Sequence, residues 1–122
     1  MIPFNIDYEG AIDFEHCDSI HEASQKLSEL TNLLNKVISV RCNAKNKILE
    51  ICSLYPNEKM HKLSWENKVV CLMFASGRSQ EVLDVVKLYN DSDEAYIKIR
   101  NKQSQVIEDL MALKKIADIT PR

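Results

Sequence analysis

Apolar residues recur through most of this chain at alternating spacings of three and four residues, and they form two long runs. The first run has eleven positions in register, one of which, Arg41, is charged. Its members are Ile20, Ala23, Leu27, Leu30, Leu34, Val37, Arg41, Ala44, Ile48, Ile51 and Tyr55. This alternation is typical of a helix that packs lengthwise against another helix. It predicts a helix over residues 19–55, about 55 Å long at a rise of 1.5 Å per residue.

The second run keeps the same period over residues 79–117 and places Gln103 in a position that is otherwise apolar. Its members are Val82, Val85, Tyr89, Ser92, Tyr96, Ile99, Gln103, Val106, Leu110, Leu113 and Ala117. The polar stretch NDSDE at residues 90–94 leaves two possibilities open, because Asp91 and Glu94 can cap a fresh helix. The unbroken register across this stretch favours one helix or a mild kink.

Short polar signals mark the ends of the predicted helices. SIHE at residues 19–22 is a capping box, in which the serine hydroxyl accepts from a backbone amide and the glutamate reaches back. Ser64 can cap a short helix over residues 64–76 that stops at Gly77 and is apolar around most of its circumference, so that it should be buried. Residues 56–62 form a connector, and Pro121 lies past any helix.

The first 18 residues have no helical period and are acidic. They predict an extended arm, residues 1–18, in front of a single helical-bundle domain, residues 19–122. Phe4, Tyr8 and Phe14 are spaced along the arm. These aromatic side chains either pack along the body of the same molecule or reach a partner.

Two helices of nearly equal length, joined by a short one, most simply fold back on each other, which predicts an all-α antiparallel hairpin. In that register Arg41 falls opposite residue 94 and Gln103 opposite residue 32. The two polar residues in the contact between the helices then meet polar neighbours, Asp93 and Glu94 for Arg41 and Asn32 and Thr31 for Gln103. Either this pairing penalises slipped alignments of the helices, or the two positions mark where the helices diverge and water enters.

Each long helix carries an apolar stripe that is wider than a contact between two helices uses. The short helix spans only about 20 Å and cannot cover the whole hairpin. The surplus predicts a protein partner, with a homodimer in a four-helix arrangement favoured and the acidic arm as an internal competitor. The residues expected to bind the partner are Leu33, Ile38, Val40, Val86, Ile107 and Ile116.

Composition agrees with one folded helical domain in a chain of 122 residues, since only two glycines and three prolines occur and 45% of residues are hydrophobic. The four cysteines form no C-x-x-C pair, and no export signal precedes them. We therefore expect reduced thiols in a cytoplasmic protein, with Cys42, Cys52 and Cys71 behaving as small buried hydrophobes on the helices. The apolar runs are too short for a membrane span.

The sequence contains few residues in a spacing that could bind a metal or carry out catalysis. A metal site would have to come from His16, Cys17, His21 and His61, but only Cys17 and His21 have ligand spacing, and Cys17 lies before the predicted helix. No glycine-bearing nucleophile turn or phosphate loop occurs. We therefore expect no metal, no cofactor and no enzymatic activity.

Nucleic acid is the second choice of partner. The net charge is −2, yet the second and fourth quarters of the sequence are basic and would lie side by side in the hairpin. The candidate contacts are Lys36, Arg41, Lys45, Lys47, Lys98, Arg100 and Lys102. The stretch IKIRNKQSQVIEDLMALKK, residues 97–115, resembles the C-terminal helix of phage recombination mediators, which are helical proteins that load recombinase on single-stranded DNA. That resemblance implies an accessory protein that binds single strands.

The first expectation remains a protein that binds other proteins. We expect an oligomeric adaptor, chaperone or inhibitor of a bacterial, phage or viral accessory system, because the chain is small, helical and without catalytic parts.

Overall fold

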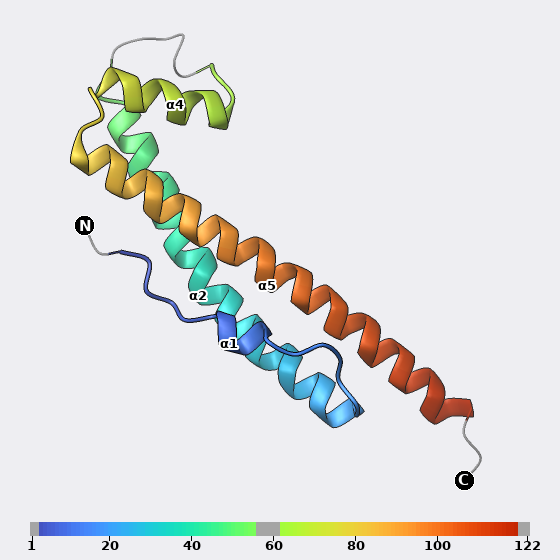
Figure 1. The fold of residues 1–122 in the computed structure, drawn as a ribbon. Coiled ribbons are helices and arrows are strands. Elements are labelled where there is room, and N and C mark those ends of the chain that lie inside the picture. Colours follow the sequence, from blue (N-terminus) through green and yellow to red (C-terminus); the bar gives the residue numbers. More distant parts are fainter. Residues whose placement is uncertain (1–2, 56–61, 120–122) are drawn as a thin grey trace. The chain divides into compact units, whose positions relative to one another are not determined.

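The computed structural model describes residues 3–55 and 62–119, and all regular secondary structure in them is helical (Figure 1). In these residues the helices are α1 (Glu9–Ile12), α2 (Ile20–Cys52), α4 (Trp65–Ala75) and α5 (Gln80–Ile119). The two long helices, α2 and α5, pack against each other, which confirms the predicted all-α hairpin-like fold. Residues 56–61 of the predicted connector, which include His61, lie outside the described residues, as does Pro121.

The chain divides into two compact units, and each long helix contributes to both. Of the described residues, 3–5, 39–55 and 62–93 belong to unit 1, while 6–38 and 94–119 belong to unit 2. The N-terminal arm is likewise shared between the two units. It is also not wholly extended, since residues 9–12 form the single helical turn α1.

The start of α2 is fixed by the capping box that the sequence predicts. The Ser19 hydroxyl accepts from the Glu22 backbone N–H at 3.1 Å, and the Glu22 carboxylate accepts from the Asp18 N–H at 3.2 Å. The helix ends at Cys52, earlier than the predicted residue 55. There the Ser53 hydroxyl donates to the Glu50 carbonyl at 2.6 Å, so a side chain competes for a carbonyl of the last turn.

Helix α4 lies within the predicted range and has the predicted ends. Ser64 accepts from the Asn67 N–H at 3.4 Å at its start. At its end Gly77 has a φ of +64°, which a glycine adopts without a Cβ clash, and the Arg78 N–H donates to the Met73 carbonyl at 2.9 Å.

Helix α5 continues through residues 90–94, which settles the question the sequence left open. Lys87 reaches Asp91 one turn later, and Lys98 reaches back to Glu94, both at 2.8 Å. Between them Ser92 is fully buried, and its hydroxyl donates to the Tyr89 carbonyl at 2.9 Å. Asp91, Ser92 and Glu94 of the polar stretch therefore make their contacts within the helix.

The core of unit 1 is formed by three helices. Helix α4 lies across the C-terminal part of α2 and the first turns of α5, and its residue Leu72 is fully buried against both (Figure 1). The buried members are Ala44, Ile48, Ile51, Cys52, Leu72, Val82, Val85, Val86 and Tyr89. Trp65, Val69 and Met73 of α4 are partly buried against this core. The predicted burial of the short helix is therefore met on one side, while Val70 and Phe74 remain exposed.

The core of unit 2 joins α2, α5 and the arm. Its buried apolar residues are Tyr8, Cys17, Ala23, Leu30, Leu34, Val37, Ala95, Ile99 and Val106. Except for Tyr8, Cys17 and Ala95, these residues are members of the two predicted runs. The arm thus completes the core of this unit with Tyr8 and Cys17.

The two polar seam residues confirm the predicted register, one in each unit. In unit 1 the Arg41 Nε donates to Asp93 Oδ1 at 2.8 Å. In unit 2 the Gln103 Nε2 donates to Thr31 Oγ1 at 3.1 Å. Both residues are paired across the two helices. Of the two alternatives, this pairing supports a role in fixing the alignment rather than a divergence of the helices at these points.

Candidate interaction surface

The six predicted partner-binding residues differ in how far they are exposed in the structure. Val86 is 6% exposed and belongs to the core of unit 1, so it cannot contact a partner. Leu33 and Val40 are half-buried. Ile38, Ile107 and Ile116 are 40%, 42% and 56% exposed, and all three lie in unit 2.

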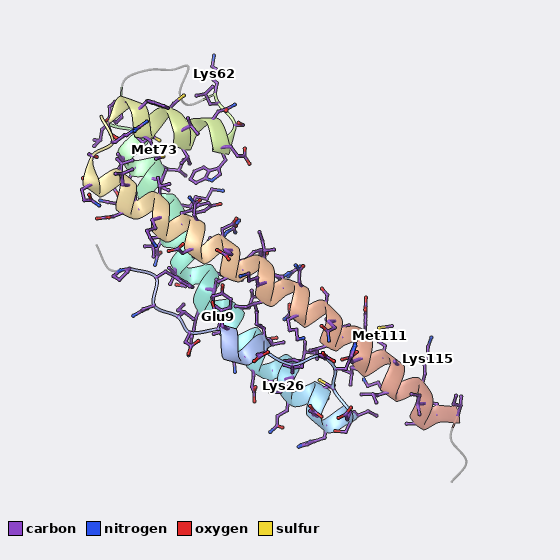
Figure 2. All side chains as sticks on the ribbon, in the orientation of Figure 1. Glu9, Lys26, Lys62, Met73, Met111 and Lys115 are labelled. Carbon is purple, nitrogen blue, oxygen red and sulfur yellow. The ribbon has the colours of Figure 1, made fainter. Side chains whose placement is uncertain are left out.

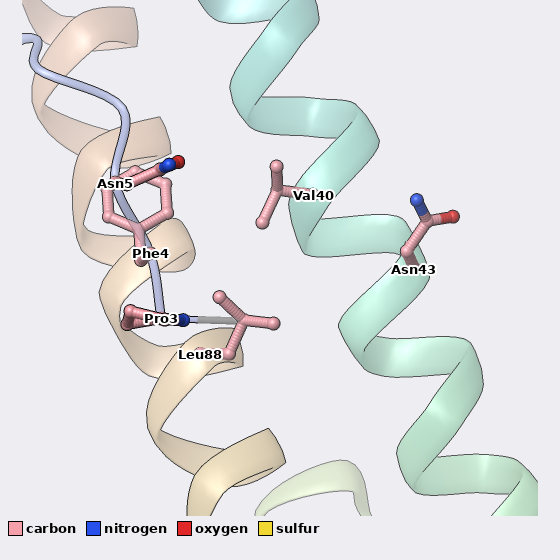
Figure 3. A pocket seen from close by; sticks show the side chains of 6 residues that line it. All are labelled: Pro3, Phe4, Asn5, Val40, Asn43 and Leu88. Carbon is pink, nitrogen blue, oxygen red and sulfur yellow. The ribbon is translucent and has the colours of Figure 1, made fainter. Parts of the chain in front are cut away.

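The arm covers part of the apolar surface of unit 1. Pro3, Phe4 and Asn5 run alongside α5, next to Leu88 of α5 and Val40 of α2 (Figure 3). Together with Asn43 these residues line a cavity of about 190 Å³. The arm packs on its own chain here, as one of the two alternatives predicted, and it competes with any partner for Val40.

In unit 2 the arm is fastened to one side of α5. The Lys102 ammonium donates to the Phe14 carbonyl and lies 4.2 Å from the centre of the Phe14 ring. Asp109 accepts from His16 Nδ1 at 3.0 Å and from the Cys17 N–H at 3.1 Å. Lys102 and Asp109 are seven residues apart, so they lie on the same side of the helix.

Asp109 is held ionised by these contacts. Its burial acts to raise the pKa, but the hydrogen bonds from the Cys17 backbone and from His16 outweigh that effect and leave the pKa below its ordinary value. The carboxylate therefore remains charged over the whole neutral range, and it ties the end of the arm to α5.

A different side of α5 in unit 2 is open. We name it the outer stripe, and all of its members are exposed and lie on the opposite side of the helix from the buried residues Ala95, Ile99 and Val106. The outer stripe consists of Ile97, Arg100, Ser104, Ile107, Glu108, Met111 and Lys115. Met111 and Lys115 project away from α2 (Figure 2).

Sequence reasoning found Ile107 but missed Ile97 and Met111, which are 49% and 58% exposed. The prediction considered only apolar residues at positions next to the two periodic runs. Ile97 and Met111 lie outside those positions, so the prediction did not include them. The available signal was their separation of fourteen residues, with Ser104 midway, which is two heptads on one helical face.

The predicted nucleic-acid contacts are divided between the units and are largely engaged within the chain. In unit 1, Lys47 lies 3.9 Å from both Glu50 and Glu81, and Lys45 lies over the Trp65 ring at 5.1 Å. Arg41, also in unit 1, is paired with Asp93, and the other four belong to unit 2. There Lys98 pairs with Glu94 and Lys102 with the arm, whereas Lys36 and Arg100 are exposed.

Unit 1 also contains a polar pocket with aromatic walls. The Trp65 and Tyr89 rings are 5.0 Å apart, and the Arg41 guanidinium lies 5.6 Å from the Tyr89 ring centre. Burial acts to lower the pKa of Arg41, but Tyr89 and Asp93 outweigh it and raise the pKa, so Arg41 stays charged. The cavity is about 410 Å³ and is lined by Arg41, Trp65, Glu66, Val69, Tyr89, Asn90 and Asp93. The Arg41 guanidinium and the Asp93 carboxylate in this pocket are already paired with each other, so the cluster stabilises the contact between α2 and α5 in unit 1.

The cysteines differ from expectation. Cys52 is buried as predicted, but Cys42 and Cys71 are exposed, so the prediction that all three are buried is wrong. Cys17, in the arm, is buried instead. Burial raises the pKa of the Cys17 and Cys52 thiols, which disfavours the nucleophilic thiolate at both positions.

Residues that could hold a metal do not converge in the described part of the chain, where no group of three histidine, cysteine or acidic side chains forms a candidate site. Of the residues considered for a metal site, His16 and Cys17 contact Asp109 instead, His16 through Nδ1 and Cys17 through its backbone N–H. His61 lies outside the described residues.

No helix in residues 3–55 and 62–119 has a stretch both long and apolar enough to cross a membrane. Comparison of the chain with protein-family models, with curated proteins and with solved structures finds no match.

Proposed function

We propose that this protein is a non-enzymatic interaction module that works as an oligomer, in the role of an adaptor, chaperone or inhibitor. One observation carries the proposal: unit 2 keeps large apolar side chains at the surface after its own arm has packed. These residues are Ile38, Ile97, Ile107, Met111 and Ile116, each between 40% and 58% exposed. Leaving a side chain of this size half exposed forgoes about 1 kcal/mol of burial, so a second protein surface gains by covering them.

Light scattering across a range of protein concentrations tests this proposal. We expect the mass to rise above that of a single chain, 14.0 kDa. Charged variants Ile38→Lys and Ile107→Lys should shift the protein toward the monomer, because an ammonium in a contact loses its hydration. Leu49→Lys is the matched control, since Leu49 is 38% exposed but lies in unit 1. A monomer at every concentration, unaffected by the variants, would remove the basis of the proposal.

Binding of single-stranded nucleic acid is the second candidate function. The observation in its favour is a set of exposed basic residues in unit 2, Lys36 and Arg100 together with Lys114 and Lys115. A salt titration of binding to single-stranded DNA tests it, because each phosphate contact adds to the slope of affinity against salt. Absence of binding at low ionic strength would exclude this function.

A further inference from the structure

We infer that the outer stripe of α5 binds the same stripe of a second copy of this chain, antiparallel to it, with the twofold axis passing at Ser104. This inference rests on the proposed self-association and names the surface and the partner. It follows from how the residues of the stripe are arranged about Ser104.

The apolar residues of the stripe match under this symmetry. Ile97 lies seven residues before Ser104 and Met111 seven residues after it, so an antiparallel copy brings Ile97 of one chain beside Met111 of the other, twice. Both side chains are about half exposed in the single chain. The small Ser104 at the crossing point lets the two helix backbones approach closely, and Ile107 on the edge of the stripe borders the contact.

The charges match in the same way. Arg100 precedes Ser104 by four residues and Glu108 follows it by four, so each arginine meets the glutamate of the other copy. A parallel arrangement would instead place Arg100 beside Arg100 and Glu108 beside Glu108. Charge complementarity therefore selects the antiparallel arrangement and a second copy as the occupant.

Arg100 and Glu108 are also the charged residues nearest Ser104 on the outer stripe. Among the described residues, neither takes part in an ion pair, although Arg100 lies 6.0 Å from the Tyr96 ring centre on its own helix. By contrast, Lys98, Lys102 and Asp109 are bound to Glu94 or to the arm. These ion pairs and arm contacts lie on another side of α5 and involve no residue of the outer stripe.

A charge-reversal experiment on the full chain tests the inference. Arg100→Glu and Glu108→Arg each place two like-charged pairs in the contact, so each alone should weaken the dimer by about tenfold or more in Kd. An equimolar mixture of the two variants should regain the dimer, since every contact then joins opposite charges. The double variant should also associate. Lys114→Glu, with the same charge change off the stripe, is the matched control.

A disulfide trap gives a second readout that does not depend on charge. Ser104→Cys, in a chain with the exposed Cys42 and Cys71 replaced by serine, should form a covalent dimer on mild oxidation, because the two cysteines face each other across the axis. Lys114→Cys should not. Circular dichroism of each variant verifies that its helices are intact.

The outcomes separate the inference from the function on which it rests. An oligomer that persists in both single variants, without rescue on mixing and without the Ser104→Cys disulfide, would overturn the α5 contact and leave self-association through another surface. A wild-type chain that stays monomeric would overturn both.

Discussion

The Gln103 side chain donates from Nε2 to the hydroxyl of Thr31 at 3.1 Å, and that hydroxyl donates in turn to the carbonyl of Leu27 at 2.8 Å. The polar residue in the middle of the second apolar run is therefore bonded across the two helices of unit 2. A slip of one helix along the other would leave the amide against apolar neighbours, which explains why a glutamine suits this position.

Replacing Gln103 tests whether its hydrogen bond stabilises the fold or only favours one alignment of the two helices. We expect Gln103→Leu to leave the free energy of unfolding unchanged or to raise it, because an apolar side chain suits the seam, and Gln103→Ala to lower it by about 1 kcal/mol. Urea unfolding followed by circular dichroism measures both. A large loss in Gln103→Leu would show that the hydrogen bond itself stabilises the fold.

We expect the pairing of Arg41 with Asp93 to make only a modest contribution to the free energy of unfolding, because both side chains are about one third exposed. A double-mutant cycle with Arg41→Met and Asp93→Asn should give a coupling energy of about 0.5–1 kcal/mol. The matched cycle uses Lys87 and Asp91, an exposed pair within one helix at the same 2.8 Å, for which we expect a smaller coupling energy. Equal coupling in the two cycles would contradict a special role for Arg41 in the seam.

Helix α4 offers a comparison within one element. Leu72 is fully buried and Phe74, two residues later, is 67% exposed. Leu72→Ala should lower the free energy of unfolding by about 2–5 kcal/mol, because it opens a cavity in the core of unit 1. Phe74→Ala should change it by less than about 1 kcal/mol. If the two losses were similar, the packing of α4 described above would be incorrect.

The tie between Asp109 and the arm should depend on pH. The pKa of Asp109 is below its ordinary value, so its contribution to stability is present above the ordinary pKa, near about 4, and is lost as the pH falls through the lower value. Asp109→Asn should therefore be less stable than the wild type at pH 7, by about 1 kcal/mol, and the difference should shrink toward pH 3.

Urea unfolding at the two pH values measures this difference. Glu29→Gln serves as the control, since it removes a carboxylate that is more than half exposed and lies 3.9 Å from Lys26. A difference between Asp109→Asn and the wild type that does not change with pH would contradict the charged tie.

The sequence pattern was sufficient for the long elements and their alignment. The two runs of alternating spacing predicted α2 and α5, and their nearly equal lengths predicted a register in which Arg41 and Gln103 both meet polar neighbours. The capping serines Ser19 and Ser64 marked the starts of α2 and α4, and in each case the hydroxyl accepts from a backbone N–H of the first turn. Local hydrogen bonding and helical period are both encoded within a few residues, so they can be read from sequence.

The details of exposure were less predictable, since they depend on which neighbour covers each side chain. Val86 was assigned to the surface but is buried in unit 1, and Cys42 was assigned to the core but is exposed. The contacts of the arm, such as Asp109 with His16, join residues far apart in the chain and have no periodic signal. For the same reason, the outer stripe could be identified only from the structure, which shows which side of α5 is left exposed.

The proposal depends on the apolar surface of unit 2 being covered by a second chain. Sedimentation equilibrium of the wild-type protein, at concentrations from low micromolar to several hundred micromolar, measures this most directly. The account predicts a mass that approaches twice 14.0 kDa as the concentration rises. A single species of 14.0 kDa over the whole range would contradict it.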